Sequence, residues 1–161
     1  MLFQIEEPDG TPIGEPEGPG AAVGIDLTRP RGAVAIAIGG NAETLTARDG
    51  SEAPETNGLR ETSGAFLAKP TIAALLTLRG RAERALARPV THAVIAITEP
   101  LDPMVRQSLA AAALASELIV TRILTSGEAI ALAHGASPGE AVAHGAAIAA
   151  EDDAFAAQRA P

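Results

Sequence analysis

The fold of this chain is decided by residues 89–135, PVTHAVIAITEPLDPMVRQSLAAAALASELIVTRILTSGEAIALAHG. Residues 90–97 and 118–124 are rich in Val, Ile and Thr, and each run is long enough for one buried strand. Between them, residues 102–115 carry apolar side chains at helical spacing and leave few polar positions for solvent. Two apolar strands joined by such a helix form a parallel crossover unit, in which helices cover both faces of the sheet. The stretch therefore predicts an α/β fold.

Strand and helix patterns continue on both sides of this stretch. Further strands are expected at residues 21–27, 33–38 and 43–47, and further helices at 70–88 and about 138–157. Ser137, with Glu140 three residues later, is expected to cap the last helix. Residues 48–69 are polar and rich in turn formers, so we expect a long loop that is mobile or bound by a partner.

The helix expected at residues 70–88 has an apolar side and a charged side. Pro70 suits its first turn, and Leu75 and Leu78 belong to the apolar side. The charged side chains are assigned to a solvated face, and they are Arg79, Arg81, Glu83, Arg84 and Arg88.

Length and composition indicate one core. The chain has 161 residues and 47% hydrophobic content, which is enough for a single domain, expected at residues 21–161. Phe3, Phe66 and Phe155 are the only aromatic residues, so Ala, Val, Ile and Leu must build the core. Residues 1–20 are rich in Pro, Gly and acids and are expected to form a flexible arm, because they bury too little apolar surface to offset their ordering entropy.

Charge and hydropathy exclude several classes of partner. The net charge of −8 and the pI near 4.8 argue against a nucleic-acid partner, which needs clustered Lys and Arg. The absence of cysteine excludes disulfides. We expect neither a secretory leader nor a membrane partner, because no charged segment with an apolar core opens the sequence and no apolar run of about 18 residues occurs in it. We expect a cytoplasmic protein.

Several motifs carry a resemblance to a known family. The segments PVTHAVI (89–95), RQ (106–107), RIL (122–124) and AIALAHG (129–135) resemble, in order and spacing, the first lobe of the ATPase domain of DnaK-type heat-shock chaperones. The segment SPGEAVAHGAAI (137–148) resembles the last helix of that domain. Two more segments, LFQIEEP (2–8) and AETL (42–45), look like the HscA branch, which serves iron–sulfur cluster assembly.

This resemblance implies a specific architecture. The expected fold is a ribonuclease-H-like domain, the first lobe of an actin-like ATPase, which opens with a β-meander. It implies a mixed sheet of about five strands, with helices on both faces and an extra C-terminal helix.

The resemblance also points to a first-strand turn that approaches nucleotide phosphates. The family turn reads Gly-Ile-Asp-Leu-Gly-Thr-Thr-Asn, whereas residues 24–31 read GIDLTRPR. Asp26 matches the family aspartate that faces magnesium. Thr28 adds a Cβ where close approach needs none, and Pro30 removes a backbone N–H. Any binding of Mg-ATP is therefore expected to be weak and to involve Asp26, Thr28, Arg29, Arg31 and Gly32.

Catalysis is not expected. An ATPase of this type clamps Mg-ATP between two lobes, and the second lobe and the catalytic lysine have no counterpart here, so neither catalytic residues nor a cofactor are expected. A ribonuclease-H-type nuclease needs at least three acids at the first strand, and only Asp26 lies there. A metal site is not expected from His134, His144, Asp152 and Asp153, because helical spacing does not bring the two histidines to the acids.

A protein-binding surface is the function that remains. Without the second lobe, the face that looks into the family cleft is exposed, and exposed apolar surface of that size normally finds cover. The expected partner surface consists of Thr98, Glu99, Leu101, Arg106, Thr125, Ser126 and Gly127. We expect a non-catalytic scaffold or adaptor that binds a protein partner or itself, with a link to iron–sulfur protein assembly implied by the resemblance. The alternatives are an ATP-binding regulator and a chaperone remnant that merely still folds.

Overall fold

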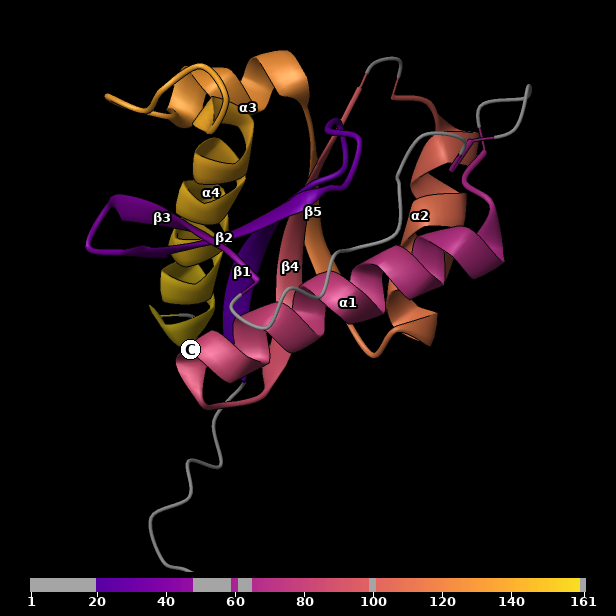
Figure 1. Ribbon diagram of the computed structural model, residues 1–161, viewed down its shortest axis with the longest axis horizontal. Helices are drawn as coiled ribbons and strands as arrows, with labels where there is room; N and C mark the ends of the chain where they lie inside the picture. Colours follow the sequence, from indigo (N-terminus) through magenta and orange to yellow (C-terminus); the bar gives the residue numbers. More distant parts are fainter. Residues whose placement is uncertain (1–19, 48–58, 61–64, 99–100, 160–161) are drawn as a thin grey trace, which may run out of the picture.

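A computed structural model describes residues 20–47, 59–60, 65–98 and 101–159 of the chain (Figure 1). These residues form a mixed five-stranded sheet and four helices, which confirms the predicted α/β class. The elements are β1 (Ala21–Asp26), β2 (Ala33–Ile38), β3 (Asn41–Leu45), α1 (Ala68–Leu86), β4 (Val90–Ile97), α2 (Pro103–Ala115), β5 (Ile119–Thr125), α3 (Ser126–Leu132) and α4 (Ala141–Arg159).

The strands lie in the order β3-β2-β1-β4-β5. Strands β1, β2 and β3 form an antiparallel meander, whereas β4 runs parallel to both β1 and β5. Helix α2 joins β4 to β5 and makes the predicted parallel crossover. The carboxyl ends of β1, β4 and β5 therefore meet at one edge of the sheet, which we call the carboxyl edge.

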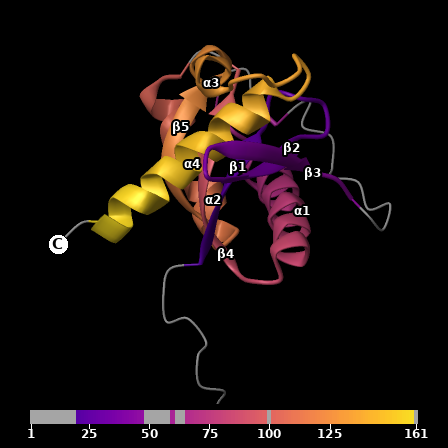
Figure 2. The ribbon, with the colours of Figure 1, turned by 90° about the vertical axis from the view of Figure 1, so that its left-hand side faces the viewer.

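Helices cover both faces of the sheet, as predicted. Helices α1 and α2 pack on one face, and α3 and α4 pack on the other (Figure 2). Strand β4 shows how the sequence assigns residues to the faces: Ala93, Ile95 and Ile97 join the core under α1 and α2, whereas Val94 and Ala96 join the core under α4. The larger side chains thus lie on the α1 and α2 face, because side chains alternate along a strand.

The α4 face is packed through close backbone approach. A Cβ built at Gly24 would lie less than 3.0 Å from the backbone of Ala146 and Ala147 in α4. A Cβ built at Gly145 would lie equally close to the backbone of Ala129 in α3. Real Cβ atoms do not approach other heavy atoms so closely, so helix α4 can reach β1 and α3 only because both positions are glycine.

A carboxylate fixes the β2–β3 hairpin to α4. Gly39 and Gly40 form the hairpin turn and have φ values of 61° and 83°, which glycine adopts without strain. Their backbone N–H groups both donate to the side chain of Glu151 in α4, with an N···O distance of 2.9 Å for Gly40. Hairpin and helix are therefore held together by polar as well as apolar contacts.

The expectation that Arg79 lies on a solvated face is wrong. Its side chain is only 16% exposed and joins three elements. The guanidinium donates to the backbone carbonyls of Val90 at 3.1 Å and Ser116 at 2.9 Å, and pairs with Glu117 at 3.0 Å. Glu83, assigned to the same face, accepts the N–H of Val90 at 3.0 Å. Helical spacing alone did not reveal these contacts, because the partners come from distant parts of the sequence.

Several predicted boundaries need correction. The last helix begins at Ala141 instead of residue 138, because Pro138 and Gly139 form a turn after Ser137. The Ser137 hydroxyl donates to the Glu140 carboxylate at 3.0 Å instead of capping a helix. The third strand covers 41–45 instead of 43–47, and α1 begins at Ala68, inside the loop expected at 48–69.

The described part of that loop packs on the domain. Leu59 and Phe66 are buried in the core under α1 and α2, and the N–H of Phe66 donates to the Ser108 hydroxyl at 2.8 Å. Residues 48–58 and 61–64 of the loop, and residues 1–19 of the expected arm, lie outside the described residues.

We predict that Gly24→Ala and Gly145→Ala each lower the free energy of unfolding by about 3 kcal/mol, because the added methyl group meets backbone that cannot move aside. The matched control is Gly80→Ala in α1, where a Cβ has space, and this variant should gain about 0.5 to 1 kcal/mol. Urea denaturation followed by circular dichroism measures all three. Equal effects at positions 24, 145 and 80 would contradict the close packing of α4.

We predict that Arg79→Met lowers the free energy of unfolding by about 2 to 3 kcal/mol, because two carbonyls lose a charged donor. Arg79→Lys should lower the free energy of unfolding by less than Arg79→Met does. It should still be destabilising, since an ammonium group cannot reach all the acceptors that the planar guanidinium reaches. The exposed Lys69→Met in the same helix serves as a control and should change stability by about 0.5 kcal/mol or less. If Arg79→Met lowered the free energy of unfolding by no more than this control does, the stabilising role of the Arg79 hydrogen bonds would be contradicted.

Candidate functional site

The carboxyl edge brings together residues from three parallel strands. Asp26 ends β1, Thr98 follows β4 and Thr125 ends β5. In the ladders, Asp26 lies beside Ala96 of β4, and Ile97 lies beside Thr125 of β5. Three segments that the sequence analysis singled out separately are thus neighbours at one edge.

Asp26 is held by its own turn. The residue is only 1% exposed, and its Oδ1 accepts hydrogen bonds from the backbone N–H of Thr28 at 2.7 Å and from the Thr28 hydroxyl at 2.5 Å. Burial raises the pKa of Asp26 above its usual value, while the two Thr28 hydrogen bonds and the charge of Arg29 partly oppose the rise. The carboxyl group therefore faces its own chain more than it faces solvent.

Two backbone donors of the turn after β1 are engaged within the turn itself. The N–H of Thr28 bonds to Asp26, and the N–H of Gly32 donates to the carbonyl of Arg29 at 3.0 Å. Pro30 has no N–H to offer. Arg29 and Arg31 are exposed on this turn. A phosphate cradle needs several backbone N–H groups that point to one place, and the N–H groups of Thr28 and Gly32 are already engaged in this turn.

The remaining residues of the expected partner surface differ in exposure. Arg106 and Gly127 are exposed, whereas Leu101 packs against the main core. Thr125 and Ser126 are half-buried at the start of α3. The Thr125 hydroxyl accepts the N–H of Glu128 at 3.3 Å, and the Glu128 carboxylate accepts the N–H of Thr125 at 3.2 Å. Glu99 lies outside the described residues.

Two residues that the sequence did not point to, Arg60 and Phe66, interact at this edge. Arg60 donates to the carbonyl of Thr98 at 2.7 Å and lies over the ring of Phe66, 4.9 Å from its centroid. Burial lowers the pKa of Arg60 and the charge of Asp102 opposes this effect. The sequence did contain a hint that this segment packs on the domain: Phe66 is one of three aromatic residues in the chain and lies in an otherwise polar stretch.

The carboxyl edge also contains a helix-capping motif, at the start of α3, that can be recognised in the sequence. Thr125 and Glu128 form a complete capping box, which the pattern Thr-x-x-Glu predicts. Asp102 caps α2 in the same region by accepting the N–H of Val105 at 3.0 Å. Both helices that start at the carboxyl edge therefore have an ordered first turn.

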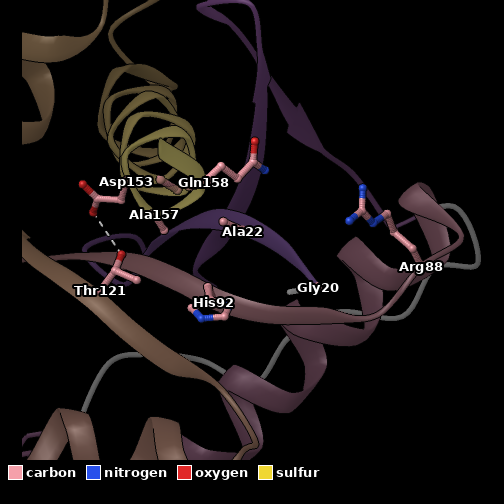
Figure 3. A pocket seen from close by; sticks show the side chains of 10 residues that line it. Gly20, Ala22, Arg88, His92, Thr121, Asp153, Ala157 and Gln158 are labelled. Carbon is pink, nitrogen blue, oxygen red and sulfur yellow. Dashed lines mark hydrogen bonds between the residues drawn. The ribbon is translucent and has the colours of Figure 1, made fainter. Parts of the chain in front are cut away.

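The histidines and acids that were weighed as metal ligands lie in two places. His134 and His144 line one pocket with Glu140, and His144 Nε2 lies 3.0 Å from the Thr44 hydroxyl. Asp153 instead accepts a hydrogen bond from Thr121 at 3.0 Å (Figure 3). It also pairs with Arg122. Among the described residues, no three His, Asp or Glu side chains converge as metal ligands would.

Comparison with known proteins gives no family: no protein-family model matches the chain, and no curated protein matches it. Within the described part of the chain, every helix is too short or too polar to span a bilayer.

We predict that Asp26→Asn raises the free energy of unfolding at pH 7. Asparagine keeps the oxygen that Thr28 binds and removes the cost of ionising a buried carboxyl. Because the folded-state pKa of Asp26 is raised, the stability it contributes is present at low pH and is lost as pH rises through that pKa. The variant should lack this loss, so its advantage should grow from pH 4 to pH 8.

Denaturation curves at several pH values measure this difference. The exposed Asp152→Asn in α4 is the matched control and should follow the pH dependence of the original chain. A difference between Asp26→Asn and the original chain that does not change with pH would contradict the burial effect.

Proposed function

We propose that this chain is a non-catalytic scaffold or adaptor that binds a partner protein at its carboxyl edge. The proposal includes a specific fold, a ribonuclease-H-like domain that corresponds to the first lobe of an actin-like ATPase. A β-meander followed by a parallel crossover unit supports this assignment, because the resemblance to DnaK-type chaperones implies that arrangement.

The observation that carries the non-catalytic part is the state of Asp26. A carboxylate that binds magnesium must present its oxygens to the ion and its waters. Here the side chain is buried and accepts two hydrogen bonds from Thr28, and burial raises its pKa. A carboxyl group that is buried and engaged by its own turn is poorly suited to hold Mg-ATP.

Exposed apolar side chains at the carboxyl edge support association. Met104 in the first turn of α2 and Ile130 in α3 are each 51% exposed, and both helices begin at this edge. The two helices pack on opposite faces of the sheet and both begin at its carboxyl edge, so a partner protein that lies across this edge can contact both side chains together with the exposed Arg106 and Gly127. We infer that the partner contacts the edge through these two helices, since Arg60 already engages the backbone carbonyl of Thr98.

The setting of this function is also a proposal. A cytoplasmic adaptor with a link to iron–sulfur protein assembly follows from the resemblance to the HscA branch. An acidic chain is suited to a protein partner, and neither nucleic acid nor a membrane is proposed as one. The second candidate is a weak ATP-binding regulator, which the retained Asp26 and the exposed Arg29 and Arg31 favour.

We predict that Met104→Asp together with Ile130→Asp reduces recovery of partner proteins from a native extract at least tenfold, because a charge in an apolar contact is strongly unfavourable. The matched control is Leu114→Asp, which changes an equally apolar and more exposed side chain near the other end of α2. Quantitative mass spectrometry of the bound proteins gives the ratio. Equal recovery by all three chains would contradict an interface at this edge.

Titration calorimetry with Mg-ATP separates the two candidate functions. The adaptor predicts no heat of binding at submillimolar ligand. A saturable heat that Asp26→Asn abolishes would support the regulator instead.

A further inference from the structure

The sheet opens between β1 and β2 at the end opposite the carboxyl edge. Pairing of β1 with β2 is confined to Gly24–Asp26 and Ala33–Ala35. The second half of β2, Ile36–Ile38, pairs with β3 and leaves the line of β1 (Figure 1). The first residues of β1, Ala21 and Ala22, pair with β4 on their other side. The two strands thus diverge and leave an opening in the sheet.

This opening is an apolar groove of about 270 Å³. Its walls are Ile36 and Ile38 of β2, Leu86 of α1 and Phe155 of α4. Ile38 is 71% exposed and Phe155 is 48% exposed, although each belongs to a regular element and lines this groove. A smaller hollow of about 100 Å³ adjoins it and shares Ala22, Arg88, Ala154 and Gln158 with it (Figure 3).

The groove has one available positive charge at its rim. Arg88 lines both hollows, is exposed and forms no ion pair among the described residues. The acid that also lines the groove, Glu151, is already engaged by the N–H groups of Gly39 and Gly40. The groove therefore fits an apolar segment that is followed by acidic residues.

We propose that residues 2–5 of this chain, Leu-Phe-Gln-Ile, occupy the groove and that Glu6 and Glu7 pair with Arg88. These four residues are the apolar part of an otherwise acidic, Pro- and Gly-rich segment, and two acids follow them directly. The groove lies where the described chain begins, since Gly20 lines the smaller hollow and Ala21 lines the larger one.

Chain length permits this contact within one molecule. Residues 6–19 join Ile5 to Gly20 and reach up to about 50 Å when extended, whereas a flexible chain of this length has an end-to-end distance of about 20 Å. Such a link gives the segment an effective concentration in the millimolar range, so weak apolar contact suffices to keep the groove covered. The arm would then shield Ile38 and Phe155 from solvent and from other molecules.

A single tryptophan reporter tests the proposal in the full chain. The sequence contains no tryptophan, and Phe155→Trp should be tolerated because Phe155 is 48% exposed. The emission of this reporter should shift to longer wavelength when Phe3→Asp removes the apolar contact. Thr11→Asp adds the same charge elsewhere in the arm and should leave the emission unchanged. An emission that Phe3→Asp does not alter would overturn the proposal.

Cross-linking gives a second measurement that does not depend on the reporter. The chain has no cysteine, so Phe3→Cys with Phe155→Cys introduces one pair at the groove. This pair should form an intramolecular disulfide at least tenfold faster than Phe3→Cys with Leu114→Cys, which places the second thiol on exposed α2. Equal rates, or disulfide-linked dimers as the main product, would overturn docking within one molecule. Because the groove and the carboxyl edge lie at opposite ends of β1, either result is independent of the proposed function.

Discussion

The close approach of helix α4 to strand β1 is the constraint on which this structure depends. Glycine at positions 24 and 145 lets the helix backbone contact the sheet and α3 directly. Most other sheet residues near this approach are small, and Ala33, Ala35 and Ala96 are examples, with Val94 and Leu124 as the larger side chains of that face. The bulk of the hydrophobic effect consequently comes from the opposite face, where large side chains such as Ile25, Ile95, Leu75 and Leu109 are fully buried. This difference between the two faces explains how a chain with only three aromatic residues forms a well-packed core.

The hydrophobic periodicity of the sequence was sufficient to predict most helices and strands and the α/β class. It was not sufficient to predict where each element begins and ends. The runs at 90–97 and 118–124 are rich in β-branched residues, and no Gly or Pro interrupts them. These two strands of the sheet were therefore predictable. The start of α4 was misplaced because Ser137 and Glu140 satisfy a capping pattern, while Gly139 between them favours a turn. Arg79 was misassigned for a different reason: a helical pattern shows which side is apolar, but it cannot show that Ser116 lies opposite.

The candidate site was predictable where topology alone determines it. Parallel strands place their carboxyl ends together, so Asp26, Thr98 and Thr125 meet without any specific side-chain contact. The engagement of Asp26 by Thr28 is local, and such bonds are common for aspartate in turns. The interactions of Arg60 and Phe66 at this edge were not predictable, because they depend on contacts across 38 and 42 residues of sequence.

The two faces of the sheet should tolerate sequence drift very differently. Under α1 and α2, aliphatic side chains of similar volume can replace one another with modest cost, so that layer can diverge while the fold persists. Beneath α4, positions 24 and 145 are limited by backbone contact, so a larger residue at either one must push α4 away from the element that it touches. Among related sequences, glycine at positions 24 and 145 should therefore remain conserved after the surrounding residues have diverged.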